Sequence, residues 1–150
     1  MAEVRTLDPA KVVISVGGVP ISGYADGTFI RVERSSDMFS KVVGADGKTA
    51  RAKSNDRSGT VILTLLQTSP SNDVLSGLAI LDELQNSGVV PIGATDLSGA
   101  TTIFSGTGWV RKMPDWEAGK EIGNIEWTID CADLEIFIGG NKASEAVLNQ

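Results

Sequence analysis

Acidic side chains around a tryptophan give this chain its first candidate chemistry. Asp115, Glu117 and Glu121 lie close in sequence to Trp116, and carboxylates beside an aromatic ring could act on a glycosidic bond. A solvated acidic turn accounts for the same residues more simply. The tryptophans could also form a sugar-stacking surface, although such residues serve more often as core or interface anchors: Trp109, Trp116 and Trp127.

Two further segments resemble ligand-binding loops without completing the patterns. The run 106–108 (Gly-Thr-Gly) is a fragment of a nucleotide-binding fingerprint, but it opens no helix and lacks the third glycine. Asp46 with Asn55 and Asp56 hints at a calcium loop, yet the EF-hand spacing is absent and basic residues intervene. Neither segment predicts a cofactor or metal site.

The composition excludes most catalytic and metal-binding classes. The chain has no histidine, which removes the commonest general base and metal ligand, and its one cysteine excludes an internal disulfide. With 13 basic and 19 acidic side chains the net charge is −6, which argues against nucleic-acid binding through the overall field. We therefore expect no enzyme, no cofactor and no metal.

The length of 150 residues fits one domain spanning 1–150, with short terminal arms at about 1–10 and 141–150. The start of the chain is not a secretory signal, and no stretch approaches the ~18 apolar residues of a membrane span. We therefore expect a protein that folds in a cytosol and does not associate with a membrane.

The elements that must position any site are mostly strands. Alternating apolar and polar residues, with frequent glycine turns, predict short strands at 12–16, 19–24, 29–33, 60–66, 89–94, 101–113 and 122–138. In the last segment the apolar positions change from odd to even numbers, which requires a bulge or bend near Ala132-Asp133.

One helix is expected at about 70–87. Ser69 is a plausible N-cap, Pro70 suits the first helical position, and Gly88 suits the end. An apolar stripe at helical spacing is expected to be core: Val74, Leu75, Leu78, Leu81 and Leu84. The fold class is therefore mainly β, an antiparallel sandwich or barrel with one flanking α-helix.

A long polar run at about 44–58 is almost free of large apolar groups, so it is expected to be an exposed loop or the tip of an extended hairpin. Residues 40–60 carry a net charge of +3, whereas residues 115–135 carry −6. Both segments could simply be solvated. The sharper hypothesis is head-to-tail self-association, the geometry that makes rings or filaments.

Several segments resemble the tail tube proteins of contractile-tailed bacteriophages. The similarity spans roughly residues 12–138 and is carried by these runs: 17–27 (GGVPISGYADG), 44–51, 55–59 (NDRSG), 65–75 (LLQTSPSNDVL), 108–110, 113–115 and 126–127. The central stretch, 44–59, is its most specific part.

The resemblance implies two packed antiparallel sheets, and hexameric rings stacked into a hollow tube through which DNA passes without specific binding. It implies a tail sheath protein, a baseplate or initiator protein and a tail terminator as partners, in a virion assembled in the host cytoplasm. Two rivals stay open: the tube protein of a secretion system or phage-derived contractile particle, and a monomeric carbohydrate-binding β-sandwich.

If the chain forms a tube, two sets of residues are expected to have roles in it. The basic run is expected to contact an acidic surface of a neighbouring subunit and to order on assembly, through Lys48, Arg51, Lys53 and Arg57. One polar strand face is expected to line the lumen: Asn124, Glu126, Thr128 and Asp130. Alternatively, that face lies outward or pairs with the basic run.

Overall fold

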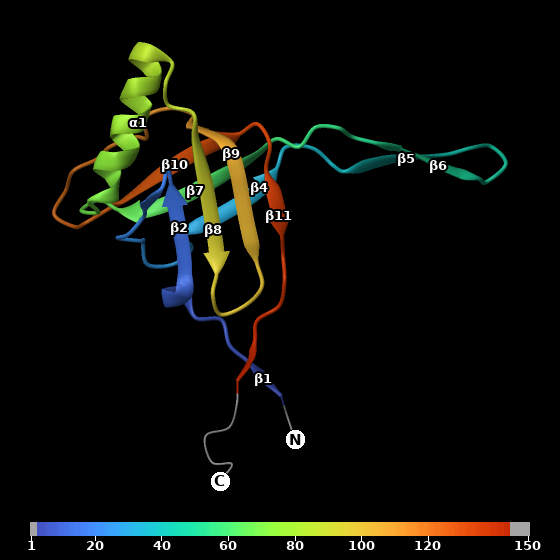
Figure 1. Ribbon diagram of the computed structural model, residues 1–150, viewed down its shortest axis with the longest axis horizontal. Helices are drawn as coiled ribbons and strands as arrows, with labels where there is room; N and C mark the ends of the chain where they lie inside the picture. The colour runs from blue at the N-terminus through green and yellow to red at the C-terminus, as the bar shows by residue number, and fades with distance from the viewer. Residues whose placement is uncertain (1–2, 145–150) are drawn as a thin grey trace, which may run out of the picture.

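The computed structural model describes residues 3–144, which form a folded-over antiparallel sheet, one helix and a projecting hairpin (Figure 1). The main sheet has the strand order β3-β2-β8-β9-β10-β7-β4, and β11 also pairs with β9. Its strands are β2 (Val12–Val16), β3 (Val19–Pro20), β4 (Ile30–Arg34), β7 (Gly59–Leu66), β8 (Val90–Asp96), β9 (Thr102–Val110), β10 (Asn124–Cys131) and β11 (Glu135–Phe137).

The sheet folds into two layers where β9 meets β10. These strands pair only over a short stretch, Ile129 with Val110 through Cys131 with Gly108. Figure 1 shows β2, β8 and β9 crossing in front of β10, β7 and β4. Within the described residues β3 and β4 end the strand order without pairing to each other, so the expected fold class is confirmed as a sandwich rather than a closed barrel.

The core lies between these layers and follows the predicted alternation. Strands β7 and β10 pair along their whole lengths, with Trp127 opposite Leu63. Their inward side chains are buried: Val61, Leu63, Leu65, Ile125, Trp127, Ile129 and Cys131. Strands β2 and β8 close the core from the other layer with Ile14, Val16, Ile92 and Ala94.

The predicted break in the last long strand is confirmed. Strand β10 ends at Cys131 and β11 begins at Glu135, and the two strands pair with opposite ends of β9. Leu134, in the bend between them, is fully buried. The change of phase therefore lets one segment follow two strand directions while both keep their apolar side chains inward.

Helix α1 (Ser71–Gln85) confirms the flanking helix but not its whole apolar stripe. Leu75 is buried and Leu78 packs partly against the core, whereas Leu81 and Leu84 are exposed, Leu84 to 75%. The prediction that these two are core is wrong because the C-terminal half of α1 extends beyond the sheet (Figure 1). The helix also ends at Asn86 (φ 54°) rather than at Gly88.

Other predicted boundaries also shift. The returning strand at 19–24 shortens to β3, and Tyr24 makes only an isolated bridge to Leu65. The terminal arms are not free tails within the described residues: β1 (Val4–Arg5) pairs with β12 (Ala143–Ser144), after which a 3-10 turn (Pro9–Lys11) leads into β2. The expected C-terminal arm, about 141–150, lies outside the described residues beyond Ser144.

The polar run is an extended hairpin. Strands β5 (Phe39–Val43) and β6 (Thr49–Lys53) pair with each other and with no other strand of the described chain. The loop interpretation therefore holds for 44–48 and 54–58, whereas 49–53 form a strand. None of the helices in the described residues is long and apolar enough to cross a membrane.

Candidate assembly surfaces

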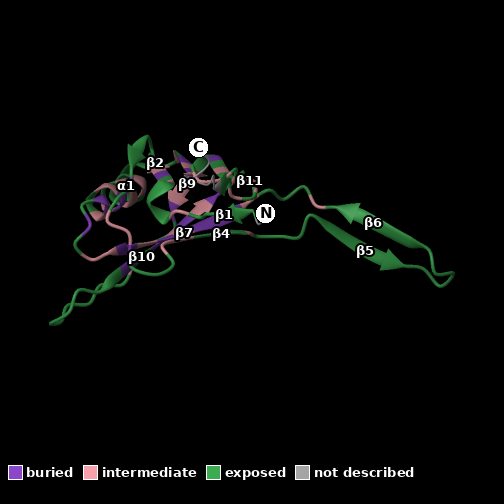
Figure 2. Ribbon diagram, turned by 90° about the horizontal axis from the view of Figure 1, so that it is seen from below, coloured by how far each residue is buried: buried purple, intermediate pink, exposed green. Residues whose placement is uncertain are grey.

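The β5–β6 hairpin projects from the body with every strand residue exposed, as the uniform exposed colouring in Figure 2 shows. Because side chains alternate across a strand, the register gives the ribbon two different faces. One, here named the basic face, carries Phe39, Lys41, Val43, Thr49, Arg51 and Lys53. The opposite face carries only small or apolar side chains: Ser40, Val42, Ala50 and Ala52.

Cations are crowded on the basic face. Lys41 lies directly opposite Arg51, and like charges in that position are destabilising. The Arg51 guanidinium carbon lies 4.1 Å from the centroid of the Phe39 ring, a cation–π contact within the ribbon. Lys53 stands opposite Phe39 on the same face. The face therefore favours an anionic partner.

Asp56 fixes the root of the hairpin. Its Oδ2 accepts a hydrogen bond from Ser36 Oγ (2.7 Å), and its Oδ1 accepts from the Ser58 backbone N–H (3.0 Å) and Ser58 Oγ (2.6 Å). These bonds, those from Ser58 first, lower the pKa of Asp56 to about 2. The two arms of the ribbon are therefore joined where they leave the body.

Arg57, at the same root, is occupied by carboxylates of its own chain. Its Nε donates to Asp133 Oδ1 at 3.0 Å, and its Nη2 lies 3.9 Å from Glu135 Oε1. Of the four predicted contact residues, Lys48, Arg51 and Lys53 thus lie on the projecting part, whereas Arg57 holds the hairpin to the body. Their contact with a neighbour stays a prediction.

The four predicted lumen residues share one face of β10. They alternate with the buried side chains and lie opposite β7 in register: Asn124 with Leu66, Glu126 with Thr64, Thr128 with Ile62, and Asp130 with Thr60. Asn124 and Glu126 are exposed, whereas Thr128 and Asp130 are half-buried. The layer β10-β7-β4 thus turns this face, here named the polar face, away from the core.

Asp130 is not a free charge on that face. Arg111 Nη2 donates to its Oδ1 at 2.7 Å and Arg111 Nε to its Oδ2 at 3.0 Å. This bonding raises the pKa of Arg111 above its ordinary value. Among the described residues no ion pair involves Glu126, so Glu126 is the uncompensated carboxylate of the predicted set.

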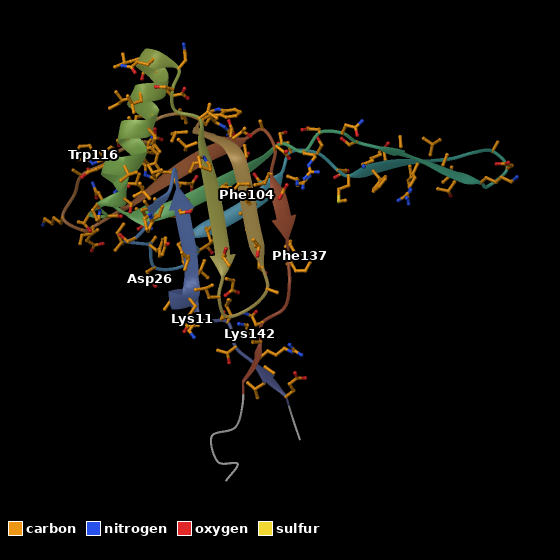
Figure 3. The ribbon with its side chains drawn as sticks, in the orientation of Figure 1. Lys11, Asp26, Phe104, Trp116, Phe137 and Lys142 are labelled. Carbon is orange, nitrogen blue, oxygen red and sulfur yellow. The ribbon has the colours of Figure 1, made fainter. Side chains whose placement is uncertain are left out.

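The segment 112–123, here named the acidic loop, is exposed, as expected for the solvated acidic turn that was the simpler interpretation of its sequence. Trp116 is 70% exposed, and Figure 3 shows it at the end of the molecule opposite the hairpin. Gln67 fixes the loop, because its Nε2 donates to Glu117 O (2.6 Å) and its Oε1 accepts from Gly123 N (3.1 Å). Two hollows of about 280 and 460 Å³ flank Pro114 and Asp115.

The three tryptophans have separate roles and do not form a common stacking surface. Trp127 is buried, and its Nε1 donates to Asn72 Oδ1 at 2.9 Å, which ties β10 to α1. Trp109 is half-buried opposite Asp130 on β9, whereas Trp116 is largely solvent-exposed. The expected core role is confirmed for Trp127, whereas an interface role for the exposed Trp116 stays a prediction.

The weak ligand-binding motifs do not assemble. Asp46 lies in the turn of the hairpin, where its Oδ1 accepts from Lys48 N, whereas Asp56 lies at the root. Gly108 lies within β9, packed on the Ile92 side chain. Across residues 3–144 no cluster of three or more cysteine, aspartate or glutamate side chains could hold a metal ion.

Two sequence comparisons both find similarity to bacteriophage proteins. Residues 1–139 match the sequence family described as bacteriophage PhiTE tail tube protein. Structural protein ORF10 of Pseudomonas phage KPP10 is 27% identical over 124 residues, which cover 81% of this chain and 72% of that protein.

Solved structures that share the fold include the following two. The anti-feeding prophage cap, described as the tube-terminating cap, has a TM-score of 0.64 and 9% identity, covering 91% of this chain and 94% of that one. The sheath/tube terminator of the extracellular contractile injection system PVC has a TM-score of 0.63 and 14% identity, covering 91% and 100%.

Proposed function

Because this chain belongs to the bacteriophage PhiTE tail tube protein family, a family of structural proteins rather than enzymes, we propose that it is the repeating subunit of a phage tail tube. Copies would join side by side into rings, with hexamers as the expected number, and the rings would stack into a hollow conduit for DNA. The sheath, an initiator and a terminator would be its partners, in a tail assembled in the host cytoplasm.

The observation that carries ring formation is the pair of open edges of the β10-β7-β4 layer. Strand β4 ends the strand order, and residues 124–127 of β10 have no described strand on the side away from β7. Unpaired strand edges are templates for pairing with another chain. Lateral pairing of neighbouring copies would satisfy both edges and continue the layer around a ring.

Such a ring supports a lumen lined by the polar face. Asn124, Glu126 and Thr128 then meet water, while the apolar side of β10 stays in the core. A conduit for duplex DNA, which carries about one phosphate charge per 1.7 Å, must not bind phosphate. Glu126, repeated around each ring, supplies repulsion, whereas Asp130 is neutralised by Arg111.

The hairpin supports stacking. A two-stranded ribbon is only marginally stable in water on its own, and all ten strand residues of this one are exposed. A contact with a neighbouring copy would bury one of its faces. In this proposal Lys48, Arg51 and Lys53 reach the neighbour, and Arg57 anchors the hairpin root.

A second candidate function is a tube terminator, the cap of a tube rather than its repeating unit. The observation in its favour is that the two solved structures named above are described as a tube-terminating cap and a sheath/tube terminator. Fold likeness at 9% and 14% identity supports an architecture common to tube and cap. A tube subunit of a phage-derived injection particle is a closer variant of the main proposal.

Microscopy of the purified protein separates these candidates. The protein would be concentrated alone and with fragments of disrupted tails as seeds, and imaged in negative stain. A repeating subunit lengthens the seeds by many rings, or forms tubes unaided. A terminator adds one layer to a seed end and then stops, and a protein that stays monomeric with seeds present would contradict both proposals.

A further inference from the structure

The basic face of the hairpin has more cations than carboxylates near it. Asp37 lines the same hollow as Lys41 and Arg51, but it forms no ion pair within residues 3–144. Lys41, Arg51 and Lys53 stand on one face of a ribbon, and the only carboxylate of the hairpin segment 39–53, Asp46, lies in the turn. The Arg51 guanidinium is held over Phe39, which fixes its position and leaves its N–H donors for another group. A partner of this face must therefore be anionic.

The hairpin extends away from the body. Each arm rises about 3.3 Å per residue, so the eight residues from Ser36 at the root to Val43 span about 26 Å. Figure 2 shows the ribbon leading away from the two layers. Its anionic partner must therefore lie on another molecule.

The acidic loop carries three carboxylates and two lysines, Lys112 and Lys120, a net charge of −1, and two of its carboxylates flank Trp116. Asp115 and Glu117 are exposed and form no ion pair within residues 3–144, while Asp133, Glu135 and Asp130 are engaged by arginines. The two bonds from Gln67 fix the loop before any partner arrives. Trp116, between the two carboxylates, offers a large exposed ring.

The two surfaces lie at opposite ends of the molecule. Hairpin and Trp116 mark the two ends of its longest axis (Figures 1 and 3). A contact between opposite ends is heterologous, and its repetition generates a ring or an open filament. Two copies therefore meet through different surfaces, and each copy keeps one surface of each kind for the next.

We propose that the basic face of one copy binds the acidic loop of a second copy, with Arg51 and Lys53 pairing with Asp115 and Glu117. The Trp116 ring packs on the apolar side chains of the same face, Phe39 and Val43. This inference rests on the proposed tube function and names the surface that the hairpin reaches. It leaves Glu126 free for the lumen.

Paired cysteines test the contact directly. Tubes would be assembled from Lys53→Cys with Glu117→Cys and oxidised, and cross-linked species would be separated on a denaturing gel. The single native cysteine, Cys131, is buried, so it contributes little background. We expect a ladder of dimers, trimers and higher species, at least tenfold stronger than in the control, Ala52→Cys with Glu117→Cys, whose first cysteine is on the other face.

Charge reversal provides the second measurement. Arg51→Glu with Lys53→Glu should reduce tube yield at least tenfold, and adding Asp115→Lys with Glu117→Lys should restore it. All four positions are exposed, so an unchanged melting temperature of the soluble subunit shows that each variant folds.

The outcomes separate this inference from the proposed function. Tubes without a ladder, or charge-reversed subunits that assemble normally, overturn the hairpin–loop contact and leave the tube function intact. A wild-type protein that does not add to tail seeds overturns the tube function and the contact with it.

Discussion

Arg111 and Asp130 join the end of β9 to the polar face of β10 through two hydrogen bonds, Nη2 to Oδ1 at 2.7 Å and Nε to Oδ2 at 3.0 Å. This bidentate pair reduces the number of uncompensated carboxylates on the polar face. Four side chains alternate on that face, but the pair leaves Glu126 as its one carboxylate without an ion pair in the described chain. The charge and the stability of the face are therefore carried by different residues.

The first prediction concerns stability. Asp130→Ala removes the bidentate acceptor and leaves Arg111 without its partner, so the free energy of unfolding should fall by about 1 kcal/mol. Glu126→Ala, on the same strand face, should change it by less than about 0.5 kcal/mol. Urea unfolding of the two variants measures both values, and equal losses would show that the paired carboxylate stabilises the fold no more than the unpaired one.

The second prediction concerns the conduit. Glu126→Lys should leave rings and tubes intact and slow DNA ejection, because the substituted side chain attracts phosphate at every ring. Ejection into lipid-free buffer would be timed by dye binding to released DNA, with Glu126→Gln as a control expected to have a smaller effect. Ejection at the wild-type rate from lysine-bearing tails would remove Glu126 from the lumen.

The third prediction concerns the attachment of α1. Trp127 is buried and donates to Asn72 Oδ1, so Asn72→Ala leaves a buried indole N–H without its acceptor. We expect a loss of about 1–3 kcal/mol for Asn72→Ala and about 3–5 kcal/mol for Trp127→Ala, which also creates a cavity. Ser76→Ala, one helical turn further along α1, is the matched control and should cost much less.

The hairpin and the core illustrate what the sequence could predict. Period-two alternation placed the buried side chains of β7 and β10 correctly, and the change of phase near Ala132 marked a real bend, because burial on one side of a strand leaves a local pattern. The helix was found for the same reason.

The sequence-based predictions were wrong or incomplete where contacts between residues far apart in the chain determine burial and pairing. Leu81 and Leu84 have core spacing, but whether a helix face is covered depends on how far the sheet extends beneath it. The pairing of Arg57 with Asp133, and of Arg111 with Asp130, joins residues 76 and 19 positions apart, and no local pattern signals either. The sequence also could not distinguish the exposed Trp116 from the buried Trp127, because exposure depends on where the loop lies in the fold.

The fourth prediction is a carboxyl pKa at the hairpin root. The pKa of Asp56, ordinarily 3.8, is lowered to about 2 by Ser58 and Ser36. The stability that these bonds provide is therefore present above pH 3.8 and is lost as the pH falls through about 2. Carbon-detected NMR titration should give a midpoint near 2, and Ser58→Ala should return it toward the ordinary value. An unshifted midpoint in the wild type would contradict the root geometry.

The fifth prediction concerns order. In the free subunit the turn 44–48 should exchange its amide hydrogens rapidly, because all its residues are exposed and the ribbon pairs with no other strand of the described chain. In assembled tubes the same amides should be protected, whereas the amides of β7 should be protected in both states. Exchange measured by mass spectrometry on subunit and tube provides the comparison, and equal exchange of the turn in both would argue against its burial.

The central claim is that the chain repeats along the tube. Helical reconstruction of the tube within intact tails, by cryo-electron microscopy, tests it most directly. We predict that every ring has density that fits this two-layer fold, with the β10 polar face toward the lumen and a hairpin leaving each copy toward a neighbour. Density for the chain in a single ring at one end of the tail, with another protein in all other rings, would contradict the claim and identify a terminator.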